Sequence, residues 1–193
     1  MGVSDTLKQL RDDTGVSIMQ CKKALEEAGG DIEKAKIILR KQSSTIASKK
    51  SDRSLGAGVA AAYTHAGGGV VGAVVLACET DFVSKNEEFA KLAYDIAMHV
   101  AAMNPLFTSR DDVKEDDLKA AREVFAEEAA KVPEAARAKA IEGKVNSYLA
   151  ERVLLEQAYV KDPGVTIQEL INTATQKFGE KIALVRFERL SVK

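Results

Sequence analysis

The sequence has no tryptophan, only two cysteines and three prolines, and its aromatic residues make up 5% of 193 residues. The cysteines, Cys21 and Cys78, lie far apart and have neither disulfide-framework nor metal-ligand spacing, which is typical of a reducing compartment. No apolar run approaches the roughly 18 residues needed to span a bilayer. The first ten residues lack the apolar segment of a secretory signal. We therefore expect a cytoplasmic protein without a membrane partner.

A strong excess of charge of either sign is also missing, because 28 Lys and Arg stand against 29 Asp and Glu. This balance argues against a nucleic-acid coat or an electrostatic membrane binder, so we expect no direct nucleic-acid partner. Charge is nevertheless uneven along the chain. Residues 1–54 carry 11 basic and 8 acidic side chains, whereas residues 55–193 carry 17 and 21. The change coincides with a change in composition that indicates two parts.

Residues 1–42 predict a small module of three short helices. Ser17 and Asp31 can cap the second and third helices, and Gly29-Gly30 separates them. Some forty residues form only a marginal core, so we interpret the module as a partner-docking device. Residues 43–54 are polar and rich in serine, which predicts a flexible linker.

Residues 55–193 predict an α+β core, in which a small antiparallel sheet packs with helices. Residues 57–65 and the apolar run 70–77 indicate a hairpin, and alternation over 181–192 indicates a final strand. Apolar residues at helical spacing predict helices over 84–103, 116–131, 134–159 and 166–178.

No catalytic or metal-binding pattern emerges from the sequence. The glycines at 67–69 lack the Lys-Ser/Thr of a phosphate loop. His65 and His99 have no ligand spacing and are expected at the surface or at an interface. Cys78 is expected to be a small buried hydrophobe. We therefore expect no metal, no cofactor and no covalent chemistry, with a cysteine enzyme using Cys21 or Cys78 as the alternative.

One short segment, Glu79-Thr80-Asp81-Phe82-Val83, lies between the buried strand and the next helix. If Ser84 is the N-cap of that helix, Asp81 and Phe82 fall on a turn, where chain is normally exposed. Burying a phenylalanine ring is worth roughly 1.5–3 kcal/mol, so an exposed ring suits a partner contact. Phe82 could equally fold back under the helix as an apolar staple, and the sequence leaves both interpretations open.

Three long motifs resemble bacterial translation elongation factor Ts, and the resemblance covers essentially the whole chain. They span Thr14–Ala35, Glu79–Asn86 and Leu154–Asp162, in the order in which the family has them. The sequence is identified as a member of this family in its short form. The resemblance implies a guanine-nucleotide exchange factor for elongation factor Tu, acting in the bacterial cytoplasm by promoting GDP release so that GTP can bind.

The resemblance also implies which residues contact the partner. A segment inserts near the magnesium and phosphate site of the G domain, and it maps onto Thr80, Asp81, Phe82 and Val83. A ubiquitin-associated-like N-terminal module supplies a second contact, which maps onto Val16, Ile18, Met19, Gln20 and Cys21. Gln20 stands where many relatives carry an acid. This chain departs from the family pattern there, because an uncharged glutamine does not form a charge pair.

Compared with the long form of the family, the chain is expected to have one half-core and no helical-hairpin insertion. A small sheet leaves unpaired edges, so we expect a twofold homodimer that binds two copies of elongation factor Tu. The candidate interfaces are the strand 181–192 and the helix 134–159. Two alternatives stay open: a monomer whose helices cover its sheet, and a co-translational chaperone or adaptor that binds another folded domain.

Overall fold

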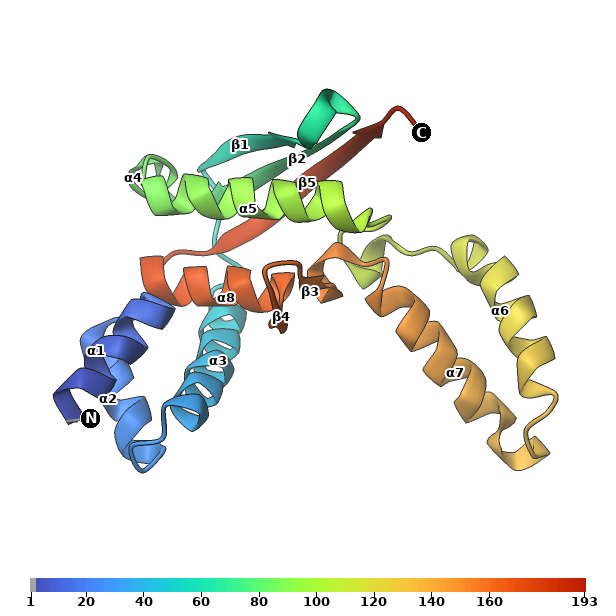
Figure 1. The fold of residues 1–193 in the computed structure, drawn as a ribbon, viewed down its shortest axis with the longest axis horizontal. Helices are drawn as coiled ribbons and strands as arrows, with labels where there is room; N and C mark the ends of the chain where they lie inside the picture. Colours follow the sequence, from blue (N-terminus) through green and yellow to red (C-terminus); the bar gives the residue numbers. More distant parts are fainter. Residues whose placement is uncertain (1–2) are drawn as a thin grey trace.

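The computed structural model describes residues 3–193 and confirms the predicted α+β class, with N-terminal helices followed by a small antiparallel sheet packed with helices (Figure 1). The α-helices are α1 (Val3–Thr14), α2 (Ile18–Glu27), α3 (Ile32–Lys49), α4 (Asp81–Ser84), α5 (Glu87–Met103), α6 (Glu115–Ala129), α7 (Glu134–Ala150) and α8 (Ile167–Phe178). The strands are β1 (Ala57–Thr64), β2 (Val70–Cys78), β3 (Ala158–Tyr159), β4 (Asp162–Thr166) and β5 (Ile182–Ser191).

The N-terminal module forms the predicted three helices, with the predicted caps. Ser17 Oγ accepts from the Gln20 amide at 3.4 Å, and Asp31 Oδ1 accepts from the Lys34 amide at 3.0 Å. Each cap satisfies a backbone donor that the helix leaves unpaired. The three helices enclose a hydrophobic cluster of their own, formed by Leu10, Val16, Cys21, Ala24, Leu25, Ala35 and Leu39.

Helix α3 continues well beyond the point where the sequence predicts that the module ends. It runs to Lys49 through the first half of segment 43–54, so the prediction of a flexible linker is wrong over that half. Serine and threonine are poor helix formers on their own, but tertiary packing overrides such preferences. Ser43 is buried, and α3 lies along α8. Arg40 Nη1 also donates to the Gly164 carbonyl of β4 at 2.8 Å.

The central sheet has the strand order β1-β2-β5, with antiparallel pairing throughout. Helix α5 crosses β1 and β2, and the main hydrophobic cluster joins the sheet, α5 and α8 (Figure 1). Gly72 permits the close approach, because a Cβ atom at this position would lie 2.2 Å from the Ala97 carbonyl oxygen. The strand β2 lies between its neighbours and is buried at Val74 and over 76–78, but Val75 is exposed, so the burial that its continuous apolar run predicts is confirmed only in part.

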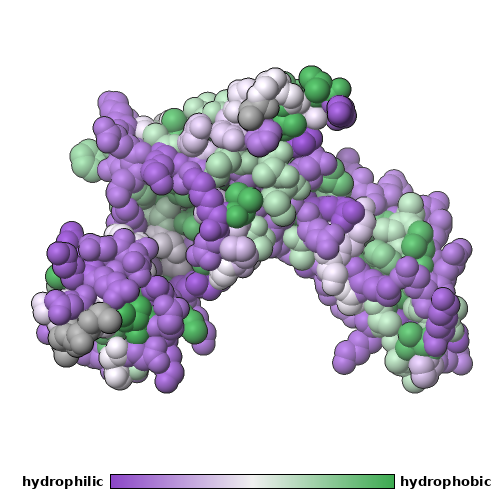
Figure 2. Space-filling view, viewed as in Figure 1, coloured by the Kyte–Doolittle hydropathy of each residue, from purple (hydrophilic) through white to green (hydrophobic). Residues whose placement is uncertain are grey.

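Helices α6 and α7 pack against each other and project from the central body as a helical hairpin (Figure 1). The expectation that the chain has no helical-hairpin insertion is therefore wrong. The two helices share a separate hydrophobic cluster that includes Leu118, Val145, Leu149 and Val153. Figure 2 shows the hairpin and the N-terminal module as two lobes on either side of the body, each with hydrophilic and hydrophobic areas on its surface.

Helix α7 ends at Ala150, nine residues before the predicted end at Tyr159. The chain turns there because Val153 and Leu154 are buried and bring the segment back to the body. Tyr159 then lies in β3, which pairs with β4. Among the described residues, no helix combines the length and apolar character needed to cross a membrane.

Candidate functional site

The segment 80–83 forms most of a single helical turn at the end of β2. Thr80 has extended backbone angles, and α4 begins at Asp81 and ends at Ser84. Val83 is 3% exposed and belongs to the main hydrophobic cluster, whereas the neighbouring Phe82 is 82% exposed. Consecutive residues of a helix point about 100° apart, so anchoring Val83 directs Phe82 into solvent.

The exposure of Phe82 decides between the two interpretations that the sequence leaves open. The side chain does not fold back under α5, so the staple interpretation is wrong. Scattered exposed apolar residues are ordinary on protein surfaces, but a nearly fully exposed phenylalanine on a short structured turn is a feature typical of interaction sites.

The helix after the segment begins at a different cap from the predicted one. Asn86, not Ser84, precedes α5, and Asn86 Oδ1 accepts from the Glu88 amide at 2.9 Å. Ser84 instead belongs to α4, where its hydroxyl donates to the Asp81 carbonyl at 3.1 Å. The prediction that Ser84 caps the helix is therefore wrong. The chain makes an additional turn before α5, and that turn carries Phe82.

Asp81 lies on the same exposed turn and is ionised. Lys85 Nζ lies 2.7 Å from Asp81 Oδ2, and this hydrogen bond lowers the pKa of the aspartate and raises the pKa of the lysine. Exposed ion pairs of this kind contribute little to stability. Asp81 can therefore exchange Lys85 for a cation or N–H donor of a partner at small cost.

The five candidate residues of the N-terminal module divide into three environments. Val16 and Cys21 are buried in the core of the module, where the thiol donates to the Val16 carbonyl at 3.6 Å. Ile18 and Met19 are 54% and 70% exposed at the start of α2. Gln20 Oε1 accepts from Gln176 Nε2 of α8 at 3.3 Å. Ile18 and Met19 are thus the members of this group that are free to touch a partner.

The cysteines and histidines do not assemble into a reactive site. Cys21 and Cys78 are both buried, and burial raises the pKa of the Cys78 thiol, which suppresses the reactive thiolate. Among the described residues, no three His, Cys, Asp or Glu side chains are grouped in a way that could hold a metal ion.

His65 is exposed as predicted, but His99 is fully buried, so the surface prediction for His99 is wrong. The Val160 amide donates to His99 Nδ1 at 3.2 Å, which leaves the proton on Nε2 to be donated to Gln157 Oε1 at 3.0 Å. Desolvation lowers the pKa of this imidazole. The residue joins α5 to the chain on both sides of β3 as a neutral structural group.

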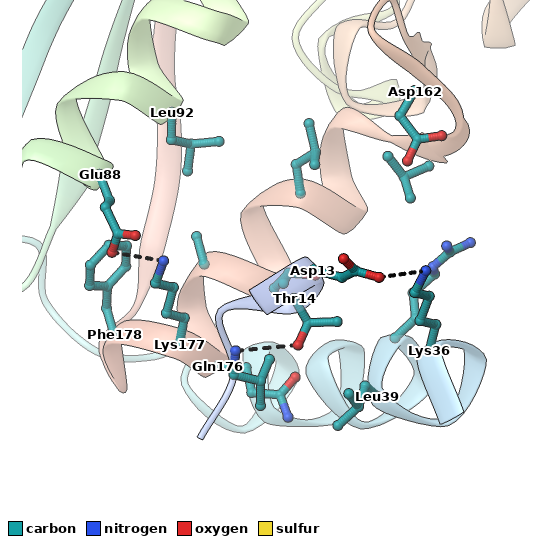
Figure 3. Close-up of a pocket in the computed structure, with 16 residues that line it drawn as sticks. Asp13, Thr14, Lys36, Leu39, Glu88, Leu92, Asp162, Gln176, Lys177 and Phe178 are labelled. Atoms are coloured by element: carbon teal, nitrogen blue, oxygen red, sulfur yellow. Dashed lines mark hydrogen bonds and ion pairs between the residues drawn. The ribbon is translucent and has the colours of Figure 1, made fainter. Parts of the chain in front are cut away.

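A cleft of about 600 Å³ lies between the N-terminal module and the core (Figure 3). Its walls carry two ion pairs, Lys36–Asp13 at 3.0 Å and Lys177–Glu88 at 2.8 Å. The cations are thus already paired with acids, and no residue of the 80–83 segment lines the cleft. The cleft marks where α3 and α8 approach each other rather than the surface that presents Phe82.

Two further residues lie at this site, and the sequence pattern indicates no role for either of them. Glu79 and Glu180 make hydrogen bonds across the base of the segment, to Lys181 and Thr80 respectively. No local pattern predicts these contacts, because the partners lie about one hundred residues apart in the chain.

A helical turn that presents an aromatic and an acidic side chain to solvent is suited to a protein that acts by docking onto a macromolecular partner. The family described as Elongation factor TS matches residues 46–193. Elongation factor Ts of Herpetosiphon aurantiacus is 42% identical over 97% of this chain and 96% of its own length. Those of Thermotoga petrophila and Desulfotalea psychrophila are 42% and 41% identical, over 97% and 98% of this chain and 94% and 97% of their own lengths.

The chain therefore belongs to the elongation factor Ts family, a family of translation elongation factors.

Proposed function

We propose that this chain is a guanine-nucleotide exchange factor for elongation factor Tu in the bacterial cytoplasm. The observation that carries the proposal is the opposed placement of Phe82 and Val83, one almost fully exposed and the other buried. Membership in the elongation factor Ts family supports the same function. Thr80, Asp81, Phe82 and Val83 are the residues proposed to enter the partner near its magnesium and phosphate site.

Exchange of this kind requires no covalent step. A protein that binds the nucleotide-free G protein more tightly than the nucleotide-bound form must weaken nucleotide binding by the same factor. An inserted Phe82 ring would displace elements that hold the magnesium ion, the largest local positive charge beside the diphosphate. Asp81 would pair with groups that this shift exposes, and GDP would leave before GTP enters from solution.

The N-terminal module is proposed to supply a second contact through its exposed apolar pair, Ile18 and Met19. A second contact on the same chain raises the effective concentration of the first and therefore the affinity. The same exposed pair is the feature that favours the alternative function, an adaptor or chaperone that binds another folded domain.

A GDP-release assay tests the proposed function. Elongation factor Tu loaded with fluorescent GDP is mixed with a substoichiometric amount of this chain and an excess of unlabelled nucleotide. We expect label release to accelerate, and each molecule of the chain to act repeatedly. Release no faster than in buffer, together with stable binding of the partner, would favour the adaptor function instead.

We also propose that two chains form a homodimer and bind two copies of elongation factor Tu. Strand β5 is an edge of the central sheet, and it carries Val185 and Leu190, both exposed. Edge strands with apolar side chains are commonly paired or covered. Of the two interfaces considered, β5 is preferred to α7, because α7 packs against α6 in the projecting hairpin.

Light scattering at micromolar concentration tests the dimer. We expect a mass near twice the 20.8 kDa of one chain. Replacing Val185 by lysine should halve that mass without lowering helicity. Val124→Lys on α6 is the matched control and should leave the mass unchanged. A wild-type mass of one chain that stays constant on concentration would show a monomer.

A further inference from the structure

The 80–83 segment is held at its base by a carboxylate from the far end of the sequence. Glu180, in the turn between α8 and β5, accepts from the Thr80 amide at 3.0 Å and from the Thr80 hydroxyl at 2.6 Å. Both oxygens of this carboxylate are used, one for each donor. The first residue of the segment is therefore fixed in two directions.

A second carboxylate makes the reciprocal contact. Glu79, the residue before the segment, accepts from the Lys181 amide at 2.5 Å and from Arg53 Nη1 at 3.2 Å. The contacts between the end of β2 and the start of β5 are thus reciprocal. Glu79 accepts from the amide next to Glu180, and Glu180 accepts from the amide next to Glu79. We call Glu79 and Glu180, with the amides of Lys181 and Thr80, the carboxylate clamp.

The clamp extends to the turn that follows α3. Lys181 Nζ donates to the Ser51 carbonyl at 2.5 Å and to the Arg53 carbonyl at 3.0 Å. Three stretches of chain therefore meet at the base of the segment: the turn after α3, the end of β2 and the turn before β5.

The exposed turn beyond the clamp has contacts of a different kind. Asp81 pairs with Lys85 of the same turn, and Phe82 is open to solvent. Of Asp81, Phe82 and Val83, only Val83 belongs to the main hydrophobic cluster. The direction in which Phe82 points is thus set from its two sides, by Thr80 on the clamp and by Val83 in the core.

We propose that Glu180 is a positioning residue for nucleotide exchange, which acts through Thr80 to hold the 80–83 segment in the orientation that presents Phe82. This inference rests on the proposed exchange function. A segment that is ordered before binding avoids the loss of conformational freedom that ordering it on the partner would entail. A side chain that must push an element of the partner aside also needs a rigid support.

A competing role for Glu180 is direct pairing of its charge with the partner, and one substitution separates the two. In Glu180→Gln the amide oxygen can still accept from the Thr80 N–H, and the amide nitrogen can donate to the Thr80 hydroxyl, which also accepts. The clamp contacts therefore persist while the charge is lost. Glu180→Ala removes the contacts and the charge together. Positioning predicts that glutamine rescues function, whereas direct charge pairing predicts that both variants fail.

GDP-release rates are to be measured for the full chain and for Glu180→Ala and Glu180→Gln, with Glu128→Gln as the matched control. Glu128 pairs with Lys144 on the helical hairpin and does not contact the segment. We expect Glu180→Ala to slow stimulated release by roughly tenfold or more, because it removes two hydrogen bonds to a charged group. Glu180→Gln and the control should stay within about twofold of wild type. Equal losses in both Glu180 variants would overturn the proposal.

A double-mutant cycle with Phe82→Ala measures the coupling between the two residues in GDP release. A general structural role of Glu180 would not produce such a coupling. If Glu180 acts through the segment, Glu180→Ala should change release little once Phe82 is absent. The same fold-loss in both backgrounds would place the action of Glu180 elsewhere. A fall in melting temperature large enough to unfold the variant under assay conditions would also refute positioning.

Amide hydrogen exchange distinguishes failure of the clamp from failure of the proposed function. Exchange at residues 80–84 should be faster in Glu180→Ala than in wild type or the control, with the rest of the core unchanged. Unchanged protection there would overturn the clamp even if the chain accelerates GDP release. Faster exchange there, with no stimulation of release by wild type, would uphold the clamp and refute the exchange function.

Discussion

Phe82 and Val83 are adjacent apolar residues with opposite surroundings. The buried valine contributes to the core, and the exposed phenylalanine contributes nothing comparable to the free energy of folding. Their separation is a consequence of the short helix α4, which directs successive side chains to different sides. Stability and partner recognition can therefore be tested separately at this turn.

We expect Phe82→Ala to slow stimulated GDP release by about tenfold or more, because central aromatic anchors dominate binding energies. The melting temperature should change by no more than about 2 °C, since truncation of an exposed side chain leaves no cavity. Thermal melts and release rates on the same preparation give both values. Val124→Ala, at another exposed apolar position, is the control. A fall in melting temperature as large as that caused by truncating a buried phenylalanine would contradict the assignment of Phe82 to partner binding.

His99 provides a second effect at the scale of a single residue. Its Nδ1 accepts from the Val160 amide, so protonation of Nδ1 would bring two donors together. Burial lowers the pKa of the imidazole below its ordinary value of 6.5. The unfolded chain therefore takes up a proton as the pH falls below about 6.5, while the folded chain does not. Folding stability contributed by this neutral histidine is lost in that range.

We expect the free energy of unfolding to fall between pH 7.5 and pH 5.5, with a slope of at most about 1.4 kcal/mol per pH unit from this group. His99→Gln should flatten the dependence, because a glutamine amide can both accept and donate but does not titrate in this range. Urea unfolding at several pH values measures the slope. Identical slopes for the variant and wild type would show that another group is responsible.

Helix ends illustrate what decides structure at the scale of an element. Thr166 and Glu169 form a capping box at the start of α8. Glu169 accepts from the Thr166 amide at 2.8 Å, and its own amide donates to Thr166 Oγ1 at 3.2 Å. At α5, by contrast, Ser84 fits the same spacing but Asn86 is the cap. Both positions offer suitable side chains, so the choice depends on the path of the chain after β2.

We expect Asn86→Ala to destabilise the chain by about 1 kcal/mol, because the Glu88 amide loses its acceptor at the start of α5. For a chain of this size the melting temperature should fall by about 2–4 °C. Ser84→Ala is the matched control and should have the smaller effect. A larger loss of stability at Ser84 than at Asn86 would contradict the observed cap.

At the scale of the whole molecule, the described residues form separate hydrophobic clusters in the N-terminal module, the central body and the helical hairpin. The module nevertheless lies against the body, because α3 packs on α8 and Lys50 Nζ donates to the Gly179 carbonyl at 2.8 Å. Its position relative to the 80–83 segment is therefore set by packing as well as by the length of the connection.

We expect deletion of residues 1–54 to leave a folded core with weaker partner binding. The main cluster lies wholly within residues 55–193, but the deletion uncovers the side of α8 that α3 contacts, so the melting temperature should fall. Circular dichroism and calorimetric titration with elongation factor Tu measure both. The full chain carrying Ile18→Ser and Met19→Ser is the control, which should lose affinity without losing stability. An unfolded core, or one with full affinity, would contradict this.

The order of most elements follows from local chemistry that the sequence carries. Local chemistry of this kind includes the period-two and helical apolar patterns, the caps at Ser17 and Asp31, and the turn at Gly29-Gly30. Each depends on neighbours within a few residues. The same holds for the position of the 80–83 segment between an apolar strand and an amphipathic helix, although the cap of that helix is Asn86 and not the predicted Ser84. These features were predicted from the sequence for that reason.

Contacts between distant residues decided the rest. Helix α3 extends through a serine-rich stretch because α8 packs against it, and α7 ends early because Val153 and Leu154 are buried at the body. His99 is covered by a segment some sixty residues away, and Thr80 is held by a carboxylate one hundred residues away. The free energy of such contacts exceeds the small local preferences of the residues involved, and it depends on which distant segments the fold places side by side.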